Sequence, residues 1–165
     1  MTMTPIVILN PQSANGSTGK RLEACADALR QVVGDFDVRV TSGPGDATRL
    51  TQDALNTGHQ WIIAAGGDGT IHEVVNGFFR EDGTPIGTPT LSLFPSGTGG
   101  DYRKTWGLDG DPKSAIQRLA GATPQPADAG RITWTTPDGN QESRYFANIA
   151  SVGLGARVSD QANKQ

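Results

Sequence analysis

Residues 61–79 read WIIAAGGDGTIHEVVNGFF, and this stretch decides the fold. Its first five residues form a short, continuous apolar run, which is typical of a strand buried on both faces of a parallel sheet. Beyond the glycine-rich turn at 66–70, apolar residues recur at helical spacing from Ile71 to Phe78. The stretch therefore predicts a strand, a glycine turn and an amphipathic helix, in that order.

The turn is a candidate phosphate-binding loop. Glycines let a ligand approach main-chain N–H groups without a side chain in the way. The following helix offers unpaired N–H groups and the positive end of its dipole. Asp68 would repel a bare phosphate, so its presence makes sense if a divalent cation lies between them, or if it accepts a proton or a hydroxyl. The alternative is a purely structural turn with Asp68 near the helix cap.

Two βα units precede this stretch. The first joins a short apolar strand at 6–9 to a helix at 20–33 through a polar loop rich in turn-forming residues. The second joins an alternating strand at 36–41, with one apolar face, to a helix that extends to about residue 56. Asp46 is the predicted N-cap of that second helix. The alternation of strands and helices predicts an α/β protein with a parallel sheet.

A second glycine loop follows a strand predicted at 90–94. It reads PSGTGGDY at 95–102, and it also carries an aspartate, Asp101. Ligands of open α/β sheets bind at the carboxyl ends of the strands. The two glycine loops are therefore expected to lie together at one edge of the sheet and to hold one polyphosphate with its metal ion.

The pattern changes after a helix that is predicted to open at Asp111. Two alternating runs, 131–135 and 144–149, flank a turn that contains Asp-Gly, and together they predict a β-hairpin. Consecutive antiparallel strands differ from the preceding alternation of strand and helix, so a domain border is expected here. The predicted division is a nucleotide-binding α/β domain at 1–129 and the start of a β-rich domain at 130–165.

The composition of the 165 residues excludes several classes of function and structure. With 14 basic and 17 acidic residues, the chain lacks the positive charge that would favour a nucleic-acid surface. Its single cysteine, Cys25, lies in the apolar stripe of a predicted helix and excludes an intramolecular disulfide. The first residues do not resemble a signal peptide, and no window is long enough to cross a bilayer, so a cytoplasmic protein is expected.

GGDGT at 66–70, followed by IHEVVNG, resembles the nucleotide-binding signature of the diacylglycerol kinase catalytic domain family. This family includes bacterial lipid kinases, sphingosine kinases and ceramide kinases, and NAD kinases and phosphofructokinases share the glycine–aspartate core more distantly. The resemblance implies a three-layer α/β/α fold with a mainly parallel sheet. It also implies a following β-sandwich domain that begins with the hairpin and is truncated here.

The resemblance further implies a site for ATP and magnesium. Asp68, Asp101 and Asp128 would form a water-linked network around the magnesium ion. At position 100 a glycine replaces the family's usual asparagine, which removes a side-chain hydrogen bond but keeps the neighbouring carboxylate. The positions that would contact the nucleotide are Asn10, Thr41, Gly66, Gly67, Asp68, Gly69, Thr70, Ile71, His72, Gly97 and Thr98.

The implied reaction is phosphoryl transfer from ATP to a lipid hydroxyl, at a membrane that a cytoplasmic enzyme reaches from its inner face. Family members carry an acidic general base in their later domain. No catalytic base is therefore expected in this chain, and little turnover is expected from its 165 residues alone.

Two other functions stay open at this point. The chain could be a non-catalytic nucleotide-binding or assembly module, in which the exposed hairpin edge pairs with a second copy to form a homodimer. It could also be an NAD kinase, although Asn10-Pro11 and Gly97-Thr98 resemble the lipid kinases more closely.

Overall fold

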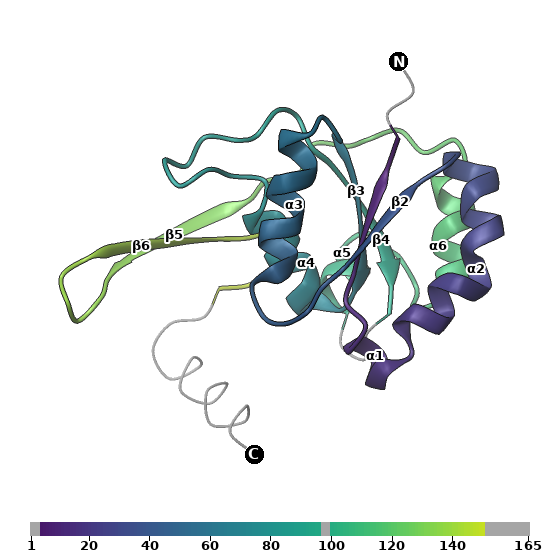
Figure 1. The fold of residues 1–165 in the computed structure, drawn as a ribbon, viewed down its shortest axis with the longest axis horizontal. Helices are drawn as coiled ribbons and strands as arrows, with labels where there is room; N and C mark the ends of the chain where they lie inside the picture. The colour runs from purple at the N-terminus through teal and green to yellow at the C-terminus, as the bar shows by residue number, and fades with distance from the viewer. Residues whose placement is uncertain (1–3, 97–99, 151–165) are drawn as a thin grey trace.

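The computed structural model describes residues 4–96 and 100–150, and Figure 1 shows their fold. Within these ranges the chain forms a parallel sheet of four strands, in the order β2-β1-β3-β4, and a separate antiparallel hairpin. The strands of the sheet are β1 (Ile6–Leu9), β2 (Asp37–Val40), β3 (Trp61–Gly66) and β4 (Thr90–Pro95), and those of the hairpin are β5 (Gly130–Thr135) and β6 (Gln141–Phe146). The helices are α1 (Ser13–Gly16), α2 (Thr18–Val33), α3 (Asp46–Asn56), α4 (Asp68–Asn76), α5 (Asp101–Thr105) and α6 (Pro112–Leu119).

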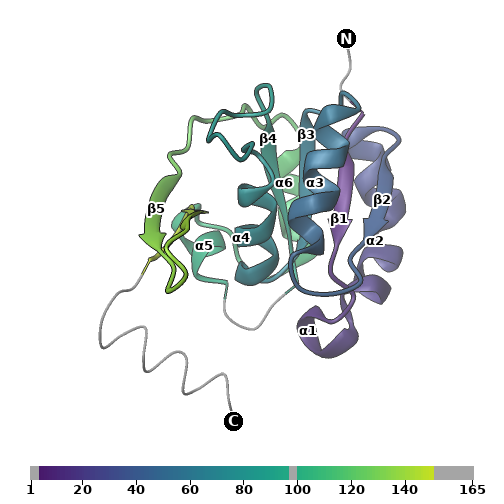
Figure 2. The same cartoon turned by 60° about the vertical axis from the view of Figure 1, so that its left-hand side comes forward.

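The sheet is buried on both faces, as the apolar run of β3 predicts. Ile62 of β3 belongs to a core cluster with β1, α3 and α4 on one face, whereas Ile63 belongs to a cluster with α2 and α6 on the other. Both side chains are fully buried. Figure 2 shows α3 and α4 in front of the sheet and α6 behind it. The predicted α/β/α arrangement with a parallel sheet is confirmed.

Strand β2 differs from its prediction. It spans Asp37–Val40 rather than 36–41, and it forms one edge of the sheet beside β1. The alternating pattern predicts a covered apolar face, but Val38 and Val40 remain 44% and 54% exposed. An edge strand lacks the second neighbouring strand that shields central positions, so its apolar residues stay accessible.

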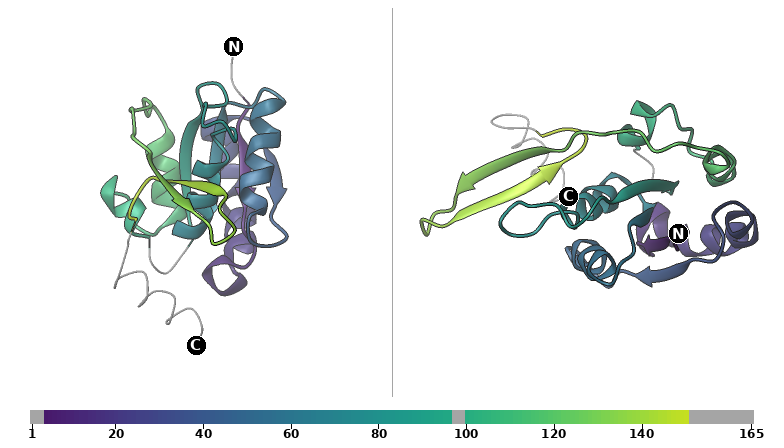
Figure 3. Two further views of the ribbon diagram at one scale, coloured as in Figure 1. Left: turned by 90° about the vertical axis from the view of Figure 1, so that its left-hand side faces the viewer. Right: turned by 90° about the horizontal axis from the view of Figure 1, so that it is seen from above.

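The predicted hairpin is present, with a tighter turn than expected. Its second strand covers Gln141–Phe146 rather than 144–149. The turn closes early because Gly139 adopts a left-handed φ of 87° and its N–H donates to the carbonyl of Thr136. Figure 3 shows the hairpin from two further sides, projecting from the α/β body.

The hairpin is fastened to the carboxyl end of α4. The side-chain amide of Asn76 donates to the carbonyl of Tyr145 and accepts its N–H, both at 2.9 Å. The Tyr145 ring stacks on Phe79, with the ring centroids 3.7 Å apart. The amide of Asn76 thus pairs with the β6 backbone as a neighbouring strand would, and the helix that follows the glycine turn also carries the hairpin.

We expect the Asn76→Ala variant to loosen the hairpin. The change leaves both backbone groups of Tyr145 without their partners and should lower the free energy of unfolding by about 1–3 kcal/mol. Hydrogen exchange at the Tyr145 amide should become faster. Asn56→Ala, at the exposed end of α3, is the matched control. Unchanged exchange at Tyr145 in the Asn76 variant would contradict this docking.

Candidate functional site

Four loops begin side by side at the carboxyl-terminal edge of the sheet. Gly66 lies beside Pro95 where β3 and β4 end. Backbone pairing continues just past the strands, since Asn10 donates its N–H to the carbonyl of Ala65 and Ser96 donates to that of Gly66. The loops after β1, β2, β3 and β4 therefore face one common region.

The two glycine loops are joined by the side chain of Asp68. Its carboxylate accepts the N–H of Asp101 at 2.9 Å and that of Tyr102 at 3.3 Å. These N–H groups open α5, so Asp68 begins its own helix and caps a neighbouring one. The end of the second loop lies directly against the first, as expected, and Gly97 and Thr98 lie outside the described residues.

A groove with a volume of about 450 Å³ lies beside the first glycine turn. Sites for small molecules occupy roughly 300–1,000 Å³. One wall comes from the loops after β1 and β2, and the other comes from the glycine turn and the first two turns of α4. The lining includes the predicted residues Asn10, Thr41, Gly67, Gly69 and Thr70, together with Glu73.

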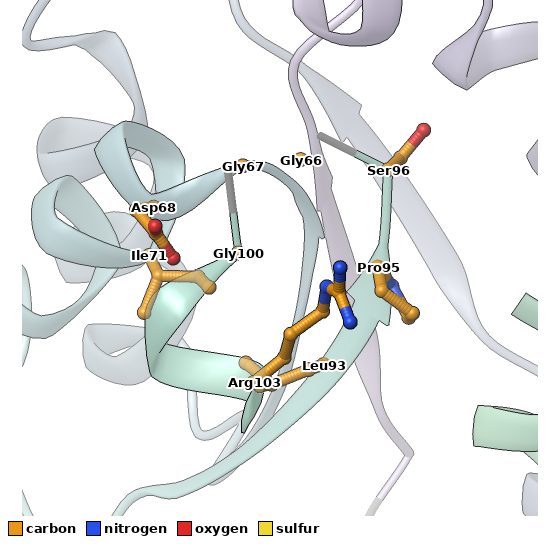
Figure 4. A pocket seen from close by; sticks show the side chains of 9 residues that line it. All are labelled: Gly66, Gly67, Asp68, Ile71, Leu93, Pro95, Ser96, Gly100 and Arg103. Carbon is orange, nitrogen blue, oxygen red and sulfur yellow. The ribbon is translucent and has the colours of Figure 1, made fainter. Parts of the chain in front are cut away.

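A smaller pocket of about 10 Å³ lies between the two glycine loops, and Figure 4 shows its lining. It has room for about one water molecule. Gly67 and Asp68 line it from the first loop and Gly100 from the second, and the guanidinium of Arg103 brings a positive charge to it. Because Gly67 also lines the groove, the two spaces meet at the glycine turn.

Gly66 makes room for the side chain of Thr70, which links the glycine turn to the loop after β1. Thr70 Oγ1 accepts a hydrogen bond from Asn10 Nδ2 at 3.1 Å. A Cβ at Gly66 would lie 2.6 Å from the Cβ of Thr70, whereas nonbonded carbons prefer about 3.5–4.0 Å. Packing inside the turn therefore requires glycine at this position.

The prediction that Asp46 is the N-cap of α3 is wrong. The N-cap is Gly45, which has a left-handed φ of 82°. The Asp46 carboxylate instead accepts the N–H of Ser42 at 2.8 Å and its hydroxyl at 2.9 Å, and it pairs with Arg49. The backbone and side-chain hydrogen bonds from Ser42 and the pairing with Arg49 lower the pKa of Asp46. Asp46 thus closes the loop that forms one wall of the groove.

The three predicted magnesium ligands are only partly brought together. Asp101 lies beside Asp68 through its backbone, while its own carboxylate is 62% exposed and pairs with Lys104 Nζ at 2.8 Å. The hydrogen bond from Lys104 lowers the pKa of Asp101. In the described part of the chain, no three Asp, Glu, His or Cys side chains gather in a group that could hold a metal ion. The set of Asp68, Asp101 and Asp128 stays a prediction.

The remaining residues predicted to contact the nucleotide differ in their position relative to the two pockets. Thr41 is buried and lines the groove, and its N–H donates to the carbonyl of Leu9. Ile71 lines the small pocket but is mainly a core residue, with 6% exposure. The exposed imidazole of His72 lies toward Asn76, 3.4 Å from its amide nitrogen, rather than among the residues that line the two pockets.

Two parts of the site are not apparent from the motifs. The carboxylate of Glu73 accepts the N–H groups of Gly45 and Ala47, which lie across the groove. The fully buried hydroxyl of Thr18 lies 2.7 Å from that of Ser96 and joins the start of α2 to the end of β4. Glu73 follows Thr70 by three residues on α4, and this spacing places it on the same helix face.

The parallel sheet with its edge loops defines an α/β protein, and the sequence comparison shows to which family it belongs. A model of the diacylglycerol kinase catalytic domain matches residues 4–132, and the chain belongs to this family. It is 34% identical over 158 residues to a "Probable lipid kinase YegS-like" of Xanthomonas euvesicatoria, covering 96% of this chain and 48% of that relative. A protein of the same description from Pseudomonas putida is 36% identical, with coverages of 83% and 44%.

Solved structures give the same result for the fold. A diacylglycerol kinase from Bacillus anthracis superposes with a TM-score of 0.67 at 28% sequence identity, covering 78% of this chain and 44% of that one. The chain spans about half the length of the relatives that it matches. Among the described residues, no helix combines the length and the apolar character needed to cross a membrane.

Proposed function

We propose that this chain is the ATP-binding portion of a lipid kinase that transfers a phosphoryl group to a lipid hydroxyl. The observation that carries the proposal is the groove of about 450 Å³ at the carboxyl-terminal edge of the sheet, with a glycine turn and the start of α4 in its wall. The family membership supports a lipid kinase over an NAD kinase. Residues 130–165 would then begin the kinase's second, β-rich domain.

The phosphates would lie at the start of α4. The first N–H groups of a helix have no carbonyl partner within it, and they attract anions together with the helix dipole. Gly69 and Thr70 line the groove at this point, and their N–H groups are the proposed donors. The nucleoside would extend along the groove toward Thr41 and Pro44 of the opposite wall. Gly97 and Thr98 would add phosphate contacts from the second loop.

Of the aspartates that the family resemblance assigns to magnesium, Asp68 lines the small pocket and Asp101 begins the neighbouring helix α5. Magnesium is usually held by one or two carboxylates together with phosphate oxygens and water, so it needs no cluster of three acids. Asp68 and Asp101 would hold it, and Asp128 would complete their water network. When bound, the ion neutralises charge on the phosphates. The exposed carboxylate of Asp101, paired with Lys104, can exchange this partner for a cation at little cost.

The acceptor end of the reaction is proposed by analogy with the relatives. The relatives are described as probable lipid kinases, and a lipid hydroxyl would approach from a membrane surface on the cytoplasmic side. Glu73 lines the groove and Asp68 lines the small pocket beside it, and both carboxylates accept backbone N–H groups. We therefore expect the 165-residue chain to bind ATP but to transfer phosphate slowly, in assays with diacylglycerol or sphingosine as acceptor.

The Asp68→Asn variant tests the magnesium assignment. Asparagine keeps one acceptor for the Asp101 N–H but removes the negative charge. By calorimetry, we expect magnesium to strengthen ATP binding about tenfold less in the variant than in the wild type, which corresponds to about 1.4 kcal/mol. Binding of ATP without magnesium should be unchanged or tighter, because a repelling charge has been removed.

Asp27→Asn, on the exposed face of α2, is the control for this experiment. If magnesium strengthens ATP binding equally in the wild type and in the Asp68 variant, Asp68 is not a ligand of the ion. If the wild-type chain does not bind ATP in either condition, the proposed function itself is wrong.

A further inference from the structure

The groove has a residue that holds its two walls together. The carboxylate of Glu73, on the second turn of α4, accepts the N–H of Gly45 at 2.9 Å through Oε1 and that of Ala47 at 3.1 Å through Oε2. Its main-chain carbonyl accepts the hydroxyl of Thr48 at 2.9 Å. Three hydrogen bonds therefore link one residue of α4 to the first turn of α3, which lies more than twenty residues away in sequence.

These contacts replace a cap that α3 does not supply itself. The N-cap position is Gly45, which has no side chain, and the carboxylate of Asp46 is directed to Ser42. The first N–H groups of a helix need acceptors from outside it, and a carboxylate is favoured there by the helix dipole. Glu73 thus caps α3 from the neighbouring helix.

The capped segment is also a wall of the groove. Thr41, Pro44 and Ala47 line the groove from this side, and Gly67 and Thr70 line it from the side of α4. The stretch Ser42–Gly43–Pro44–Gly45 is exposed and contains two glycines, so it has much conformational freedom to lose on binding. Together with the bonds from Ser42 to Asp46, the bonds from Glu73 restrict that freedom before a ligand arrives.

We infer that Glu73 is a positioning residue for the nucleoside part of the ligand, acting by fixing the Thr41–Gly45 wall at its distance from the glycine turn. The inference rests on the proposed ATP site. Glu73 contacts this wall, whereas the glycine turn is held by Asn10, Thr70 and Asp68. Loss of the Glu73 carboxylate should therefore weaken binding of the nucleoside and leave binding of the phosphates intact.

The test compares ATP with inorganic tripolyphosphate, each with magnesium, for the full 165-residue chain. In Glu73→Ala we expect the Kd for ATP to rise about tenfold or more, because the ligand must now order the wall itself. The Kd for tripolyphosphate should change less than twofold. Hydrogen exchange at the Gly45 and Ala47 amides should accelerate in the absence of ligand. A general loss of structure would instead weaken the binding of both ligands.

Two further variants make the test specific. Glu23→Ala, on an exposed position of α2, controls for the removal of a helical glutamate. In Glu73→Gln the amide oxygen can accept only one of the two N–H groups well, so its ATP affinity should lie between those of the wild type and Glu73→Ala. If Glu73→Ala does not fold, the same comparison is made with Glu73→Gln, for which we expect the affinity for ATP to fall about threefold.

The outcomes separate the two proposals. If the wild type binds neither ATP nor tripolyphosphate, the proposed function fails, whereas the exchange measurement still reports whether Glu73 orders the wall. If the wild type binds both ligands and the Glu73 variants bind ATP equally well, or lose both ligands to the same extent, Glu73 has no positioning role for the nucleoside.

Discussion

Replacing Gly67 with valine is expected to weaken ATP binding strongly without straining the backbone of the turn. Gly67 lines both the groove and the small pocket, directly before the first N–H groups of α4. A branched side chain here would occupy the space through which phosphates reach these donors. We expect the affinity for ATP to fall by at least about a hundredfold, or about 2.8 kcal/mol, as measured by calorimetry.

The backbone at Gly67 makes this variant informative. Its φ of −94° and ψ of −170° lie in the extended region, which valine adopts readily, so the substitution should not strain the backbone. Ala24→Val, on an exposed position of α2, adds similar bulk away from the groove and should bind ATP as the wild type does. A Gly67 variant with wild-type affinity would remove the glycine turn from the site.

The largest expected effect on stability comes from Gly77→Ala. Gly77 ends α4 where this helix crosses α3, and a Cβ there would lie 2.6 Å from the Cβ of Thr51 and 2.7 Å from the carbonyl oxygen of Thr48. Overpacking of this kind costs about 1–3 kcal/mol. We expect a value near the upper end, about 3 kcal/mol by urea unfolding, because a backbone atom cannot move aside as a side chain can.

Replacing a different glycine of α4 with alanine should raise the free energy of unfolding rather than lower it. A Cβ at Gly69 meets no atom within 4 Å in the described part of the chain, and Gly69 lies inside the helix. Gly69→Ala should therefore stabilise the fold by about 0.5–1 kcal/mol. If both variants had equal stability, close packing between α3 and α4 would not explain the glycine at position 77.

The parts of the fold that could be predicted are those whose signals are local. The apolar run of β3 is continuous because both of its faces are covered by helices, and this is visible in the sequence itself. Asp111 caps α6 by accepting the N–H groups of Lys113 and Ser114, as the Asp-Pro pair predicts. The start of α4 after the glycine turn follows from the same kind of local pattern.

The parts that could not be predicted depend on neighbours distant in sequence. Asp46 has the residue type and position of an N-cap, but Ser42 competes for its carboxylate and Glu73 caps the helix instead. Val38 and Val40 alternate like half-buried residues, but their exposure is decided by the place of β2 at the edge of the sheet. A sequence pattern reports neither the order of the strands nor which acid reaches which helix.

The candidate site also has parts that could be predicted from the local sequence and parts that could not. The glycines and Thr70 could be predicted because the loop that they form is a recognisable motif. The role of Asp68 as the cap of α5 could not, since it depends on how close the two glycine loops lie in space. Asp68, which the sequence assigns to a cation, accepts two backbone N–H groups in the structure.

The pairing of Asn76 with β6 has a mechanical consequence. Helix α4 begins at the glycine turn and is nine residues long, about 13 Å from end to end. The ribbon formed by β5 and β6 is thus attached to the far end of the same short rod whose near end would face the phosphates. A tilt of the ribbon would therefore act on the Asn76 pair and, through α4, on the glycine turn.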